Sequence, residues 1–103
     1  MKTVNASEDQ TDDRYNIRVL ERAFRILAVL SDGKPRSLQT LSREVNLSTS
    51  TTFRQLSTLV HHRYIERDPQ TGQFSLGLSC LELARSYYMG NEVRRAALPA
   101  SIW

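Results

Sequence analysis

The fold is decided by residues 37–76, which read SLQTLSREVNLSTSTTFRQLSTLVHHRYIERDPQTGQFSL. The first part predicts two short helices, because Ser37 and Ser48 are good N-caps and each precedes apolar residues at helical spacing. The second helix is expected to end near His62. Asn46 stands between the two helices and tolerates the left-handed backbone that a tight turn requires. This stretch therefore predicts a helix-turn-helix.

A β-hairpin is expected directly after the second helix. Residues 64–67 and 73–76 alternate in character and flank the Pro- and Gly-bearing segment 68–72. Apolar periodicity on either side predicts a helix over 17–30 and a linker helix over 78–89. The predicted fold class is mainly α with a small β-hairpin: a winged helix-turn-helix, in which a three-helix core carries a wing, followed by a linker helix.

Charge is distributed unevenly along the chain. Residues 1–13 hold one lysine against four acidic residues, a net charge of −3, and the remainder carries +6. The acidic, polar N-terminus predicts a disordered tail over 1–15. A winged helix-turn-helix DNA-binding domain is expected over 16–77 and the linker helix over 78–91. The arginine-rich body suits phosphate groups, because a guanidinium can donate two hydrogen bonds to one of them.

Several function classes are disfavoured by the sequence. No apolar run approaches the roughly 20 residues of a transmembrane helix, and residues 1–7 lack the apolar core of a secretory signal. Cys80 is the only cysteine, and His61 and His62 have no further metal ligands at a suitable spacing. No hydroxyl has a histidine and an acid placed to activate it. We therefore expect a cytoplasmic protein without membrane contact, metal, cofactor or catalysis.

The second helix of the pair carries the candidate DNA contacts. If its leucines face inward, Thr49, Ser50, Phe53, Arg54 and Ser57 face outward, and helix N-termini also attract phosphate. Arg54 can reach guanine or phosphate, and Phe53 can either touch a thymine methyl or join the core. Arg67 on the wing either contacts phosphate or pairs with a neighbouring acid. The candidate DNA-binding residues are Ser48, Thr49, Ser50, Thr52, Phe53, Arg54, Ser57, Arg67 and Arg22, although either Thr51 or Thr52 is also expected to point inward.

Residues from about Ile17 to Pro99 resemble the N-terminal region of the IclR (isocitrate lyase regulator) family of bacterial transcription factors. The resemblance rests on VLERAFRIL (19–27), LSREVNLSTSTTFRQL (41–56), YIERD (64–68), FSLG (74–77) and RRAALP (94–99). It implies operator-DNA binding by dimers or tetramers, with Ser50, Thr51 and Arg54 matching the recognition helix. Asn46 and Arg63 stand where the family usually has glycine, and Gln55 replaces a usual leucine. The last two departures predict an altered start of the wing and a looser recognition helix.

In the family, the helix that begins near Glu92 leads into a C-terminal domain of roughly 150 residues that binds a small-molecule effector. The resemblance therefore implies that residues 92–103 are the truncated start of that domain, and that no effector binds this chain.

Partners follow from the apolar faces and from the resemblance. The apolar set of helix 17–30 is wider than one core needs, so we expect a homodimer through helices 17–30 and 78–89 on double-stranded operator DNA. Two alternatives stay open. The chain could be a winged-helix protein-interaction module, or a truncated competitor that dimerises with full-length regulators.

Overall fold

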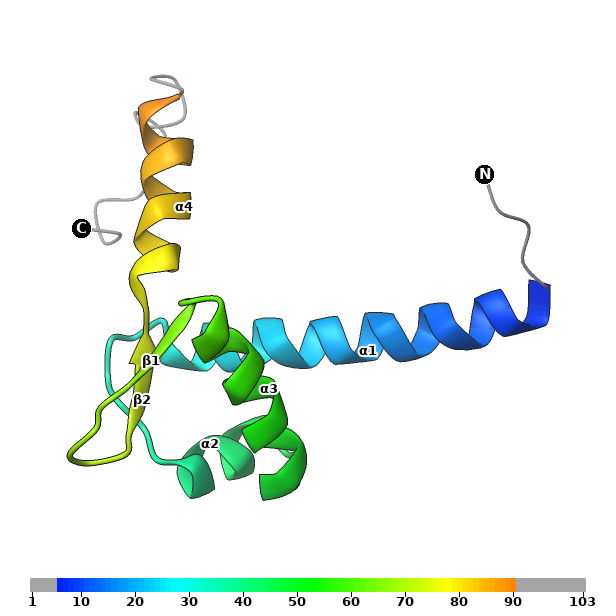
Figure 1. The fold of residues 1–103 in the computed structure, drawn as a ribbon, viewed down its shortest axis with the longest axis horizontal. Coiled ribbons are helices and arrows are strands. Elements are labelled where there is room, and N and C mark those ends of the chain that lie inside the picture. The colour runs from blue at the N-terminus through cyan, green and yellow to red at the C-terminus, as the bar shows by residue number, and fades with distance from the viewer. Residues whose placement is uncertain (1–5, 91–103) are drawn as a thin grey trace.

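The computed structural model describes residues 6–90. Its elements follow in the order α1 (Ala6–Leu30), α2 (Leu38–Val45), α3 (Thr49–His61), β1 (Ile65–Arg67), β2 (Phe74–Leu76) and α4 (Leu78–Met89). Figure 1 shows α2 and α3 packed below one end of α1, with the hairpin beside them and α4 leading away from it. The predicted fold class, mainly helical with a small antiparallel hairpin, is confirmed.

The first helix is longer than the sequence predicted. It begins at Ala6 instead of near Ile17, so the expectation of a disordered tail over 1–15 is wrong for residues 6–15; residues 1–5 lie outside the described range. Residues 6–30 contain neither glycine nor proline, the two residues least favourable inside a helix. Helix propensity therefore outweighs the acidic composition on which the prediction of disorder relied.

The turn between α2 and α3 is built as predicted. The Ser37 hydroxyl accepts a hydrogen bond from the Thr40 N–H at 3.2 Å, and the Ser48 hydroxyl accepts one from the Thr51 N–H at 3.1 Å. Asn46 adopts the left-handed conformation, with φ 58° and ψ 49°. These local interactions end one helix and start the next within three residues.

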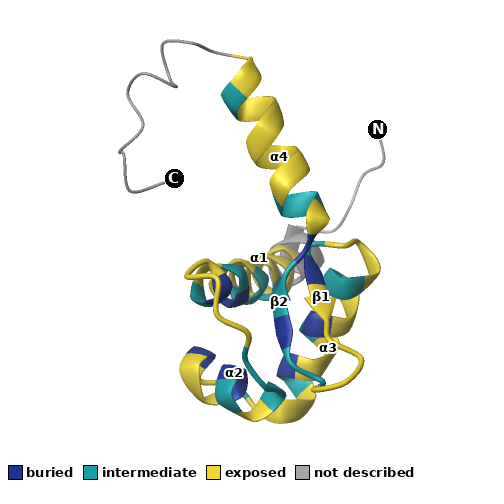
Figure 2. Ribbon diagram, turned by 90° about the vertical axis from the view of Figure 1, so that its left-hand side faces the viewer, coloured by how far each residue is buried: buried dark blue, intermediate teal, exposed yellow. Residues whose placement is uncertain are grey.

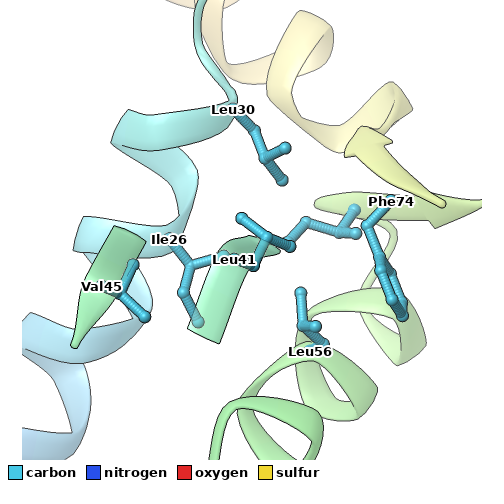
Figure 3. Close-up of a cluster of buried hydrophobic side chains, with 7 residues drawn as sticks. Ile26, Leu30, Leu41, Val45, Leu56 and Phe74 are labelled. Atoms are coloured by element: carbon cyan, nitrogen blue, oxygen red, sulfur yellow. The ribbon is translucent and has the colours of Figure 1, made fainter. Parts of the chain in front are cut away.

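Seven side chains form the core: Ile26 and Leu30 of α1, Leu41 and Val45 of α2, Leu56 of α3, Ile65 of β1 and Phe74 of β2. The side chains labelled in Figure 3 converge from α1, α2, α3 and the hairpin. Burying each such side chain contributes about 1.5–3 kcal/mol. The core therefore fixes α3 against the C-terminal half of α1.

Arg36 joins the hairpin to the helices. Its backbone pairs with Phe74 through two hydrogen bonds of 2.9 and 2.7 Å, and its guanidinium contacts Asp32 at 2.7 Å and Glu44 at 2.8 Å. Hydrogen bonds from the Arg36 side chain and then from the Lys34 N–H hold the pKa of Asp32 well below its usual range, and the pKa of Arg36 is raised in turn. Both groups therefore stay charged.

The backbone at the start of the wing, at Arg63, lies close to the backbone at its end, at Gly77. Arg63 has a left-handed φ of 66°. Its carbonyl accepts a hydrogen bond from the Ser79 N–H at 2.9 Å. A Cβ at Gly77 would lie 2.5 Å from that same carbonyl oxygen. Glycine is therefore required where the wing passes into α4.

The linker helix α4 projects away from the core. None of its residues is buried, and within residues 6–90 it packs mainly against β1 (Figure 2). The Ser79 hydroxyl donates to the His62 carbonyl at 2.9 Å, which ties its first turn to the end of α3. Across residues 6–90, none of the helices combines the length and apolar character needed to span a membrane.

Candidate nucleic-acid interface

The first two turns of α3 present most of the predicted contact residues to solvent. Thr49, Ser50, Arg54 and Ser57 are all exposed. The side chains of Ser50, Arg54 and Ser57 share the side of α3 that faces away from the core, because positions 52, 56, 59 and 60 take the inward side. Thr49 is exposed as the first residue of the helix. Short hydroxyl side chains at a helix start leave room for another molecule to approach the free backbone N–H groups.

Phe53 of α3 and Ser48, which precedes the helix as its N-cap, are also exposed but differ in character. Phe53 is 43% exposed and lies outside the core, so the alternative of a core aromatic is wrong. The Ser48 hydroxyl caps α3 and also donates to Thr51 Oγ1 at 3.0 Å. Its first role is therefore structural, and a contact with DNA would have to be shared with the cap.

Thr52 does not belong to this surface. Its exposure is 0%, and its hydroxyl donates to the Ser48 carbonyl at 2.8 Å. The prediction of a DNA contact at Thr52 is wrong. The sequence left open whether Thr51 or Thr52 points inward, and packing against the core selects Thr52.

Arg67 lies at the end of β1, exposed on the wing. Its Nε donates to the Gly72 carbonyl at 3.3 Å, and its guanidinium lies 5.1 Å from the centroid of the Phe74 ring. Among the side chains described over residues 13–90, the ion pairs are those of Arg36, so the alternative of an Arg67 ion pair with a neighbouring acid is not realised there. The contacts with the hairpin hold Arg67 on the wing surface.

A hollow of about 400 Å³ lies between α3 and the middle of α1. Arg22 of α1, which is half-buried, and Arg54 of α3 both line it. The complete lining is Tyr15, Val19, Arg22, Thr51, Arg54, Gln55 and Thr58. Sequence reasoning singled out both arginines but did not bring them together, because their proximity depends on how α1 packs against α3.

Gln55 occupies the wall of this hollow and not the core. It is half-buried, and no buried side-chain nitrogen or oxygen within the described range lacks a hydrogen-bond partner. The polar substitution that the resemblance marked as a departure is therefore accommodated at the α1 side of α3. Within the same range, no group of three His, Cys, Asp or Glu residues could hold a metal ion.

The geometry defines a class of protein: a winged helix-turn-helix whose second helix exposes hydroxyl, aromatic and guanidinium groups at its start. This is the arrangement that places a helix against the edges of bases in a DNA groove.

Comparison with known proteins narrows the class. Residues 19–69 match the model of the IclR helix-turn-helix domain. The glycerol operon regulatory protein of Streptomyces griseus is 33% identical over 84 residues, which are 81% of this chain and 33% of that protein. The chain belongs to the IclR family, whose helix-turn-helix domain implies DNA-binding transcription regulation.

Solved structures agree with this assignment. An IclR transcriptional regulator from Alicyclobacillus acidocaldarius superposes with a TM-score of 0.69 at 26% identity, over 74% of this chain and 31% of that one. An IclR homolog from Microbacterium sp. strain HM58-2 gives 0.67 at 29% identity, over 79% and 34%. The chain thus spans about a third of the length of these relatives.

Proposed function

We propose that this chain binds double-stranded operator DNA sequence-specifically, with α3 in the major groove. The observation that carries the proposal is the exposed start of α3, where Thr49, Ser50, Phe53 and Arg54 surround free backbone N–H groups. Small hydroxyls allow close approach, and the aromatic ring and the guanidinium offer contacts to a thymine methyl and to guanine or phosphate. Ser57 extends the same side by one turn.

The wing supports the groove helix in this proposal. Arg67 is exposed and held on the hairpin by the Gly72 carbonyl and the Phe74 ring. A guanidinium fixed in this way loses little conformational entropy when it binds a phosphate. We assign Arg67 to the DNA backbone, which positions the domain without reading sequence.

A second copy of the chain is the partner that the apolar faces favour. Leu20 and Phe24 of α1 and Leu83 of α4 line an apolar groove of about 550 Å³, and Phe24 and Leu83 are 60% and 59% exposed. An isolated helix of 12 residues is marginal in water, and α4 buries none of its side chains within one chain. A homodimer through residues 17–30 and 78–89 would cover these faces and present two α3 helices to DNA.

The competing functions make different use of the same surfaces. A protein-interaction module would use the apolar faces of α1 and α4 and leave the start of α3 without a ligand. A competitor of full-length regulators would form mixed dimers through those faces. We favour DNA binding because Thr49, Ser50 and Arg54 are exposed together at the start of α3, beside a single aromatic ring and without an acidic residue. We further propose that the chain is not an enzyme and, because its ligand is chromosomal DNA, that it acts in the cytoplasm.

The test is selection of bound sequences from a random duplex pool with the full chain, followed by titration of the selected duplex. We expect a preferred sequence in two half-sites roughly 34–36 Å apart, or a multiple of this, because two recognition helices of a dimer enter successive major grooves. Wild type should prefer the selected duplex, whereas a Ser50→Ala/Phe53→Ala variant should lose that preference; Arg85→Ala, far along α4, is the matched control. Recovery of no preferred sequence would overturn the proposal.

A further inference from the structure

Two arginines, Arg22 and Arg54, line the same hollow, and neither guanidinium has a hydrogen-bond or ion-pair partner among the side chains described over residues 13–90. Arg25 donates to the Val45 carbonyl, Arg36 pairs with two acids, and Arg67 is held by the wing. Arg22 and Arg54 instead line one hollow between α1 and α3. Two cations are thus brought together without a counter-charge on the lining.

The hollow has the chemistry of an anion site. Two like charges on one surface repel each other, and Arg22 also follows Arg18 at a spacing of four on α1, where like charges destabilise a helix. No acidic residue lines the hollow, whereas Thr51 and Gln55 add side chains that can donate hydrogen bonds. An oxyanion between the two guanidinium groups would relieve the repulsion. A phosphate suits this position better than a monatomic anion, because its oxygens can accept paired hydrogen bonds from a guanidinium.

The position of the hollow favours a phosphate of DNA over a free one. Thr51, Arg54, Gln55 and Thr58 follow the spacing of three, four and seven that defines one side of a helix, and that side adjoins the exposed face of α3. If that face enters a major groove, the strand that borders the groove passes along its flank. A phosphodiester would then lie between α3 and α1.

We propose, resting on the proposed function, that Arg22 and Arg54 jointly bind one phosphate group of the DNA backbone in this hollow. Arg54 is then a positioning residue for the recognition helix and does not read a base. Arg22, which lies outside the helix-turn-helix pair, becomes part of the interface through the packing of α1. Sequence reading is left to Thr49, Ser50, Phe53 and Ser57.

The test compares wild type with Arg22→Ala, Arg54→Ala, Arg22→Ala/Arg54→Ala and Arg85→Ala on the selected duplex and on a scrambled duplex, at several salt concentrations. Each single hollow variant should lose about tenfold in affinity for both duplexes, and its log–log salt slope should fall by about one. The double variant should lose less than the product of the two single losses, because both groups serve one phosphate. Arg22→Lys should retain the salt slope.

The outcomes separate this inference from the proposed function. If wild type shows no preference for the selected duplex, the proposed function fails. If wild type is specific but Arg22→Ala behaves as Arg85→Ala, the hollow is not a phosphate site. If Arg54→Ala weakens only the selected duplex, Arg54 reads a base and the inference is overturned. Thermal unfolding of each variant verifies that the fold is kept.

A separate measurement distinguishes the source of the phosphate. Inorganic phosphate is titrated against chloride at matched ionic strength while the Nε–H signals of Arg22 and Arg54 are followed by NMR. If the hollow binds a phosphate of the DNA backbone, the selected duplex should perturb both signals. Inorganic phosphate at millimolar concentration should not prevent this perturbation. The opposite result would be that inorganic phosphate saturates both signals while Arg22→Ala leaves the affinity for the duplex unchanged. The hollow would then bind a free anion, and the proposal that the phosphate belongs to DNA would be overturned.

Discussion

Arg63 carries a left-handed backbone at the start of the wing, at a position where the resemblance implied glycine. Its carbonyl is fixed by the Ser79 N–H, and the backbone of Gly77 approaches the same oxygen too closely for a Cβ. The surrounding backbone therefore imposes the φ of 66° on a residue with a side chain. Such a conformation costs about 1–2 kcal/mol for a non-glycine residue.

Replacing Arg63 with glycine should therefore stabilise the protein. Relief of the left-handed strain exceeds the added entropy of the unfolded chain, which leaves a net gain of about 0.5–1 kcal/mol in the free energy of unfolding. Urea denaturation measures it. The matched control is Arg43→Gly in α2, where the backbone is helical and glycine should cost about 1 kcal/mol. If both variants lost the same free energy of unfolding, the proposed backbone strain at Arg63 would be contradicted.

At the scale of elements, the junction of α2 and α3 depends on short-range hydrogen bonds, and for this reason it could be predicted from sequence. The cap residues Ser37 and Ser48 and the left-handed Asn46 act on neighbours no more than four residues away. Thr52 could not be placed in the same way, because its burial depends on how α3 rotates against the core. The meeting of Arg22 with Arg54 likewise requires the packing of α1.

Removal of the α3 cap tests the local account. Ser48→Ala should lower the free energy of unfolding by about 1 kcal/mol, since the Thr51 N–H would lose its acceptor. Ser48→Asp should restore it. Ser57→Ala, on the exposed side of the same helix, is expected to stay within about 0.5 kcal/mol of wild type. A Ser48→Ala variant as stable as the Ser57→Ala control would show that the cap is unimportant.

The connection from α1 to α2 should make stability depend on acid. The pKa of Asp32 is depressed in the folded state by Arg36 and by the Lys34 N–H, so its contribution is present above the ordinary aspartate pKa of about 3.9 and is lost as the pH falls below it. We therefore expect Asp32→Asn to lose less stability than wild type between pH 5 and pH 2. Denaturation at each pH measures this, and parallel losses would contradict it.

At the scale of the whole molecule, the chain separates a small core from two helices that extend beyond it. Figure 1 shows α1 and α4 leading away from the α2–α3 pair in different directions. The sequence indicated the wide apolar faces of both helices but not the length of α1, because an acidic composition alone does not distinguish a disordered tail from a helix that begins at Ala6. The described core alone does not cover those faces.

A single charge in the apolar groove should separate the copies of a dimer. Leu83→Glu would place a carboxylate on the exposed apolar face of α4, where burial in an interface is costly. We expect a dimer for wild type and a folded monomer for Leu83→Glu by sedimentation equilibrium. Ser86→Glu, also exposed on α4, should remain dimeric. A monomeric wild type would contradict the dimer without bearing on DNA binding by one copy.

The central claim is that the exposed start of α3 reads duplex DNA, and the ratio of two affinities tests it most directly. The dissociation constant of the full chain is measured for the selected duplex and for its scrambled counterpart at near-physiological salt. Specific recognition predicts a preference of about a thousandfold or more. Equal affinities for the two duplexes, with the same salt dependence, would mean that the chain binds DNA only through its charge, and would contradict the claim.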